Sequence, residues 1–69
     1  MTTKDFGALL RALREESGIT QYRLMKDKVI GSTTQLQDIE EARRDVRLST
    51  VLRLLDAYDK ELKIIDKSK

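Results

Sequence analysis

Four stretches of this sequence place apolar side chains at the spacing of one helical face, and this pattern constrains the fold more than any other feature. In the first stretch the apolar residues occupy positions i, i+3, i+4 and i+7, as Phe6, Leu9, Leu10 and Leu13. That spacing predicts an amphipathic α-helix with these side chains turned towards a core. We expect the helix to end at Gly18, because glycine readily adopts the left-handed conformation that closes many helices.

Short polar residues mark the starts of the next two predicted helices. Thr20 is a favoured N-cap for a helix over about residues 21–28, and Ser32 begins the S-x-x-Q pattern of a capping box. In the third helix, Leu36 and Ile39 are the only large apolar residues, so the opposite side is polar and available for binding. The stripe of the fourth predicted helix consists of Leu48, Val51, Leu52, Leu55 and Tyr58.

Two apolar features lie outside these stripes. Leu54 is off the stripe of the fourth helix, so we expect it outside the core. The short, partly β-branched segment at about 62–65 predicts a β-strand, although disorder or a helix is an alternative. One strand cannot satisfy its own backbone groups, and an antiparallel copy of itself is the simplest partner. The dimer interface expected on this basis comprises Leu54, Leu62, Ile64 and Ile65.

Composition narrows the chemistry that the chain can perform. Its 69 residues fit a single domain over 1–69, and it contains no cysteine and no histidine. We therefore expect no disulfide, metal, cofactor or enzymatic activity, and a homodimer is the remaining way to add apolar burial. No signal peptide or membrane span is recognisable, which favours a cytoplasmic protein without a membrane partner. The net charge is only +2, so any binding to an acidic partner depends on where the charges lie.

The second and third predicted helices form a helix-turn-helix pattern over about residues 20–42. The major groove of duplex DNA admits one α-helix, and residues near the start of the second helix of such a motif contact base edges. The candidate base-contacting residues are Thr33, Thr34, Gln37 and Asp38. Gln21 and Ser32 stand at the two helix starts, where we expect phosphate contacts. The alternative is that these residues merely cap and solvate the helices.

These residues resemble a known family. The motif Thr20-Gln21, Leu24, Ser32-Thr33-Thr34, Leu36, Ile39-Glu40 and Leu48-Ser49-Thr50 is similar to the Xre/Cro-repressor helix-turn-helix family. The similarity extends over roughly residues 6–65. The stretch 44–50, followed by 61–64, resembles HipB-like antitoxins in particular, in which a C-terminal strand pairs across a dimer.

The resemblance implies a fold and further site residues. The fold would be an all-α, four-helix, lambda repressor-like DNA-binding domain with a short C-terminal β-strand. A charged pair between the first and third helices would fall on Arg14 and Glu40. Arg43, Arg44 and Arg47 would lie beside the DNA backbone and contact phosphates, although they are also compatible with an ordinary solvated surface.

Two functions follow from these expectations. The first is a sequence-specific transcriptional regulator of double-stranded DNA, a repressor that binds a palindromic operator as a dimer. The alternative is an antitoxin of a toxin–antitoxin module whose main partner is a kinase-like toxin protein. A structural adaptor is disfavoured by the polar, capped third helix.

Overall fold

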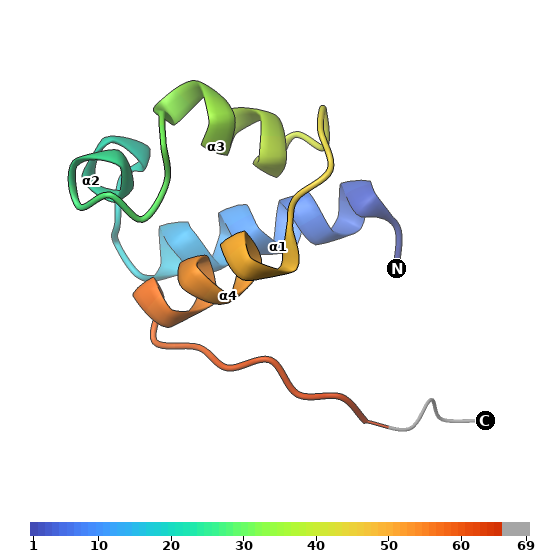
Figure 1. The fold of residues 1–69 in the computed structure, drawn as a ribbon. Coiled ribbons are helices and arrows are strands. Elements are labelled where there is room, and N and C mark those ends of the chain that lie inside the picture. The colour runs from blue at the N-terminus through green and yellow to red at the C-terminus, as the bar shows by residue number, and fades with distance from the viewer. Residues whose placement is uncertain (66–69) are drawn as a thin grey trace.

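The computed structural model describes residues 1–65 and has an all-α architecture (Figure 1). Its four helices are α1 (Thr3–Glu16), α2 (Gln21–Lys26), α3 (Thr33–Glu40) and α4 (Leu48–Ala57). α3 packs against both α1 and α2, while α4 lies on the lower side of the body in the view of Figure 1. The core draws on all four helices and on the turn between α2 and α3; it consists of Leu10, Leu24, Ile30, Leu36, Ile39, Val51, Leu54, Leu55 and Tyr58.

The predicted caps of α2 and α3 are confirmed. The hydroxyl of Thr20 accepts a hydrogen bond from the backbone N–H of Arg23 at 3.0 Å. The hydroxyl of Ser32 accepts one from the backbone N–H of Gln35, also at 3.0 Å. Each bond satisfies one of the backbone donors that a helix start leaves without a partner. The short polar residues of the sequence therefore fix where the two helices of the motif begin.

Each of the four helices ends at a residue with positive φ, two positions beyond its last helical residue. These residues are Gly18 (72°), Lys28 (63°), Ala42 (60°) and Asp59 (58°). The expected end of α1 at Gly18 is confirmed, whereas α2 stops at Lys26, earlier than the predicted limit near residue 28. In each case the next N–H donates back to a carbonyl of the last helical turn, which is the Schellman arrangement. The reversals after the helices are thus set by local backbone geometry.

The buried side of α4 differs from the predicted stripe. Leu54 is fully buried, which contradicts the expectation that it lies outside the core and rules out a place for it in an exposed interface. Leu48 and Leu52 were expected to be buried, but they are 64% and 47% exposed. α4 carries apolar residues around more than half of its circumference, and packing against the other helices selects the side that contains Leu54. The apolar residues that α4 leaves in solvent are therefore Leu48 and Leu52.

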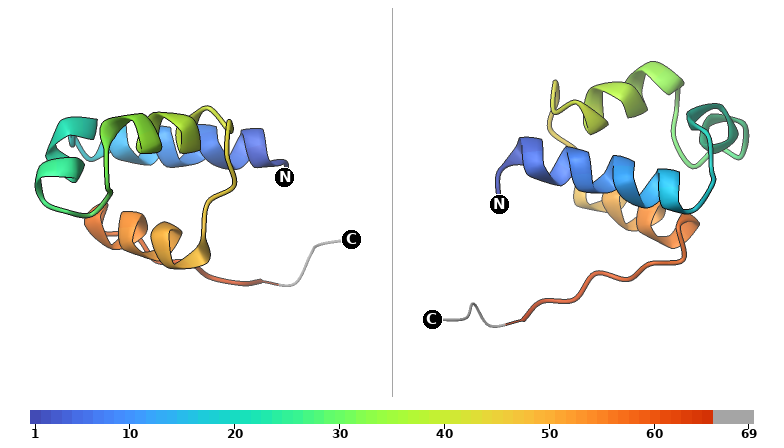
Figure 2. Two further views of the ribbon diagram at one scale, coloured as in Figure 1. Left: turned by 45° about the horizontal axis from the view of Figure 1, so that its top comes forward. Right: turned by 180° about the vertical axis from the view of Figure 1, so that it is seen from behind.

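The strand predicted at about 62–65 is absent from the part of the chain that the structure describes. Residues 61–65 form a non-helical segment that turns back below α4 and then extends beyond the helices (Figure 1 and Figure 2). Ile64 and Ile65 are 95% and 83% exposed. A strand needs a neighbouring strand to pair with, and residues 1–65 offer none. No helix within residues 1–65 combines the length and the apolar content needed to cross a bilayer.

Candidate nucleic-acid interface

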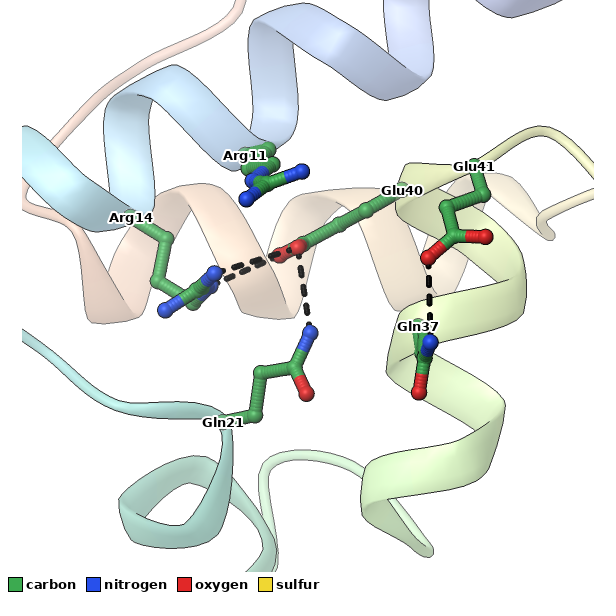
Figure 3. Close-up of a pocket in the computed structure, with 6 residues that line it drawn as sticks. All are labelled: Arg11, Arg14, Gln21, Gln37, Glu40 and Glu41. Carbon is green, nitrogen blue, oxygen red and sulfur yellow. Dashed lines mark hydrogen bonds and ion pairs between the residues drawn. The ribbon is translucent and has the colours of Figure 1, made fainter.

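A buried ion pair fixes α3 against α1. The guanidinium group of Arg14 on α1 makes two hydrogen bonds to the carboxylate of Glu40 on α3, from Nε to Oε2 at 2.8 Å and from Nη2 to Oε1 at 3.2 Å (Figure 3). The two side chains are only 11% and 2% exposed. Such a two-pronged contact restricts rotation as well as separation. It therefore sets which side of α3 faces outwards.

Neighbouring groups complete this network. The side-chain amide of Gln21 donates to Oε1 of Glu40 at 3.2 Å, and Nη1 of Arg14 donates to the carbonyl of Ile19 at 3.1 Å. The hydrogen bond to Glu40 is the main reason why the pKa of Arg14 lies above its ordinary value. α1, α2 and α3 are thus tied through one carboxylate. Gln21, an expected phosphate contact, is already held by this network.

The same crossing of α1 and α3 depends on a glycine. A Cβ atom on Gly7 would lie 2.7 Å from the carbonyl oxygen of Ile39 and 2.7 Å from that of Glu40. Both atoms belong to backbone, which cannot move aside without displacing α3. Gly7 therefore allows the close approach that brings Glu40 within reach of Arg14.

The outward side of α3 is polar. Thr34 and Gln37 are exposed, while Thr33 and Asp38 are half-buried at its two edges. The amide of Gln37 donates to Oε2 of Glu41 at 3.0 Å, which holds it along the helix (Figure 3). This side offers hydroxyl, amide and carboxylate groups at the spacing of one helical face, which are the groups that read base edges in a major groove.

The arginines that follow α3 face acidic side chains. Nη2 of Arg44 lies 2.9 Å from Oδ2 of Asp38, and Nη1 of Arg43 lies 3.6 Å from Oδ1 of the same carboxylate. Arg43 also pairs with Glu41. Both arginine side chains remain about half exposed, at 60% for Arg43 and 48% for Arg44. Surface pairs of this kind are weak, so the two guanidinium groups can exchange partners readily.

The two remaining residues expected to contact phosphates, Ser32 and Arg47, lie at the starts of α3 and α4. The hydroxyl of Ser32 is engaged by the N–H of Gln35, as its capping role requires. Arg47 is exposed and occupies the N-cap position of α4, but its side chain makes no cap hydrogen bond. The structure thus brings the expected base contacts onto one side of α3, and distributes the expected phosphate contacts around that side.

Two residues of the candidate interface, Arg11 and Glu41, were not predicted from the sequence. Arg11 lines a hollow of about 410 Å³ on the α1 side of α3, next to the buried ion pair (Figure 3). Glu41 lines the same hollow and holds both Gln37 and Arg43. Arg11 stands three positions before Arg14 on α1, and that spacing places both arginines on one flank of the helix. The spacing is thus the sequence signal that was available for Arg11.

Tyr58 is buried near the ion pair and should make the stability of the domain sensitive to high pH. Its side chain is 3% exposed, and its hydroxyl has no hydrogen-bond partner within residues 1–65. Burial raises the pKa of Tyr58 to about 12, and the negative charge of Glu40 contributes in the same direction. Because the ordinary value is 10.0, ionisation favours the unfolded chain above that pH.

We therefore expect Tyr58 to contribute a loss of stability as the pH rises from about 10 to about 12, and none below about pH 10. The Tyr58→Phe variant should lack this contribution, of up to about 2 kcal/mol, while being at least as stable at neutral pH because no hydrogen bond is removed. Urea denaturation of both proteins across this range provides the measurement. Equal alkaline losses in the two proteins would show that Tyr58 does not ionise with unfolding.

Comparison with known protein families adds one finding. The family model described as a helix-turn-helix domain matches residues 5–60, which include α2, α3, α4 and most of α1. No curated protein and no solved structure matches the chain.

Proposed function

The chain belongs to the helix-turn-helix domain family, a DNA-binding family that is typically non-enzymatic, and from this premise we propose that it is a sequence-specific transcriptional regulator. In this proposal it is a repressor that binds a palindromic operator in double-stranded DNA. The observation that carries the proposal is the outward, polar side of α3, which the buried pair of Arg14 and Glu40 holds in one orientation.

In the proposed complex α3 enters the major groove. Gln37 leaves Glu41 and pairs with an adenine, for which a side-chain amide has the matching donor and acceptor. Thr33 and Thr34 are short enough to allow close approach to base edges. Asp38 accepts a hydrogen bond from a cytosine amino group, because its carboxylate oxygens are acceptors.

The phosphate contacts surround this reading side. Arg43 and Arg44 exchange their pairs with Asp38 and Glu41 for backbone phosphates. This exchange releases the carboxylate of Asp38 for base contact at the moment when the arginines are taken up by DNA. The remaining proposed phosphate contacts are Gln21, Ser32 and Arg47.

The test compares variants of the reading side with variants of the arginines. Thr34→Ala and Gln37→Ala should relax sequence preference by about 1–3 kcal/mol, with little change on random duplexes. Arg43→Gln and Arg44→Gln should weaken binding to all sequences, and each should reduce the salt slope by about 1 because one phosphate is no longer neutralised. Gel-shift titrations on selected and random duplexes measure both effects, with Lys60→Gln, whose side chain pairs with Glu16 of α1, as a control. If Thr34→Ala and Gln37→Ala lose the same affinity on every duplex, these residues of α3 do not contact bases.

We further propose that the regulator acts as a homodimer. Exposed apolar side chains remain on α4 and beyond it, namely Leu48, Leu52, Leu62, Ile64 and Ile65. A partner's segment at 62–65 would supply the neighbouring strand that residues 1–65 do not offer. A two-fold dimer would also present two copies of α3 to half-sites about 34–36 Å apart.

Truncation tests the dimer. Sedimentation at micromolar concentration should give a dimer for the full chain and a monomer for a chain ending at Lys60, because the truncation removes the proposed strand. A full chain that remains monomeric, or a truncated chain that dimerises equally well, would contradict the assignment.

The antitoxin is the second candidate, and the same exposed apolar side chains favour it, since they suit a protein partner. A complex with a kinase-like toxin through this surface would depend less on salt than DNA binding does. Pull-down with a kinase-like toxin, at low and high salt, distinguishes the two partners.

A further inference from the structure

A second pocket, on the other flank of α3 from the buried ion pair, is lined by arginines. It has a volume of about 400 Å³ and lies between the end of α3, the connection to α4, and the first turns of α4. Its charged lining residues are Arg44, Arg47, Arg53 and Asp45. Arg53 stands on α4, and neither the sequence motif nor the proposed contacts above include it.

The positive charge in this pocket is only partly balanced. Arg44 pairs with Asp38, whereas Arg47 and Arg53 form no ion pair within residues 1–65. Asp45 is the one carboxylate among the lining residues. Guanidinium groups present planar donor pairs that match the oxygens of a phosphate, so the excess charge favours an anion of that shape.

The wall formed by α4 adds unused hydrogen-bond donors. α4 has ten residues, and its N-cap residue Arg47 makes no side-chain cap bond, so the backbone N–H groups of its first turn lack a cap. Thr50 lines the pocket, is only 5% exposed as a residue, and adds a hydroxyl group to this wall. Its position in an arginine-lined pocket points to a ligand with acceptor oxygens.

The positive surface continues beyond this pocket along the same flank of α3. An adjoining hollow of about 420 Å³, next to the turn that precedes α3, is lined by Lys28, Gly31, Gln35 and again Arg53, among others. Arg53 therefore stands where the two hollows meet, beside the middle of α3. A DNA strand that borders the groove occupied by α3 would run along such a flank.

We propose that the pocket between α3 and α4 binds a phosphate group, with Arg53 as a ligand beside Arg47 and Thr50. This inference rests on the proposed function for the identity of that phosphate, which is then a phosphodiester of the DNA strand next to α3. Arg44 contributes when its pair with Asp38 opens. Arg53 contacts no base in this arrangement, so it acts on affinity for every sequence alike.

Two probes test the pocket, inorganic phosphate and duplex DNA. In the wild-type protein, titration with inorganic phosphate should shift the NMR signals of the backbone N–H of Thr50 and of the arginine side chains, and Arg53→Gln should abolish these shifts. On duplex DNA, Arg53→Gln should weaken binding roughly fivefold to tenfold near 0.1 M salt and lower the salt slope by about 0.9, as expected when one phosphate fewer is neutralised. Arg53→Lys should keep most of the slope but lose part of the affinity, because lysine is a point charge without the planar donor pair.

Lys60→Gln is the matched control. It removes one exposed positive charge at the far end of α4, where Lys60 pairs with Glu16, and it should leave DNA affinity and phosphate shifts unchanged. Arg53 is exposed, and thermal denaturation of each variant verifies that the fold is retained.

The outcomes separate the pocket from the function. If Arg53→Gln and Lys60→Gln behave alike on DNA, or if phosphate moves no signal in the pocket, the proposal is overturned. If wild-type protein binds phosphate at Thr50 and Arg53 but binds no duplex, the anion site stands and the DNA-binding function fails.

Discussion

Replacement of Glu40 by alanine is expected to unfold most of the domain at room temperature. The variant strands the guanidinium group of Arg14, which is only 11% exposed, and it removes the acceptor of the Gln21 amide. Breaking a buried ion pair in this way costs about 3–5 kcal/mol. A domain of this size has a total stability of about that magnitude. Circular dichroism at 222 nm during urea titration measures the loss.

The matched control is Glu41→Ala, which removes the neighbouring but exposed carboxylate and should change stability little. A double variant, Arg14→Met with Glu40→Leu, should recover much of the loss, because apolar replacement of a buried pair is often neutral or stabilising. That recovery would identify the stranded charge as the cause. A Glu40→Ala protein with the wild-type urea midpoint would instead show that the pair contributes nothing.

The second large effect is expected for Gly7→Ala. At an unobstructed helical position alanine is about 1 kcal/mol more favourable than glycine. Here the added Cβ would press on two backbone carbonyl oxygens of α3 at 2.7 Å. Overpacking of this kind costs about 1–3 kcal/mol or more, and moving α3 away would also stretch the pair between Arg14 and Glu40. We expect a net destabilisation of about 2 kcal/mol.

Ala12, which is exposed on the same helix, gives the reference in the opposite direction. Ala12→Gly should cost about 1 kcal/mol through helix propensity alone. Thermal denaturation of both variants separates the two causes. If Gly7→Ala raises the melting temperature, propensity dominates and α1 does not approach α3 as closely as described.

Local signals in the sequence were sufficient to predict where the helices of the motif begin. Thr20 and Ser32 cap helices through bonds that span three residues, so their chemistry does not depend on the rest of the fold. Gly18 ends α1 for the same reason. Lys28 and Ala42 do the same for α2 and α3, but neither residue type favours a positive φ, and their roles were not predictable.

Other features of the fold depend on tertiary packing, which the local sequence pattern does not specify. α4 has leucines at 48, 52, 54 and 55, which offer two overlapping apolar sides, and spacing alone favoured the wrong one. Glycine at position 7 shows no periodicity that would reveal a backbone so close that an added Cβ would lie 2.7 Å from its carbonyl oxygens. The predicted strand at 62–65 depends on a second strand, and residues 1–65 contain none.

The outward residues of α3 were predictable from the sequence, and the family resemblance implied the pair of Arg14 with Glu40. The other ion pairs around α3 were not predictable. Thr34 and Gln37 are outward-facing, as a capped helix with a narrow apolar stripe implies. The pairs of Arg43 and Arg44 with Asp38 depend on how the chain turns back after α3. That turn passes through Ala42 with a φ of 60°, which composition and spacing do not reveal.

The division of α3 into two sides bears on how such a regulator can diversify. The residues that hold the helix are Leu36, Ile39 and Glu40, all buried. Thr34 and Gln37 are exposed on the opposite side, so substitutions there are nearly free of structural cost. If α3 reads DNA as proposed, duplicated copies of the gene could acquire new target sequences through substitutions at a few outward positions, while the buried residues that hold the helix stay unchanged. Substitutions that change recognition and substitutions that change stability would then fall on different residues of α3.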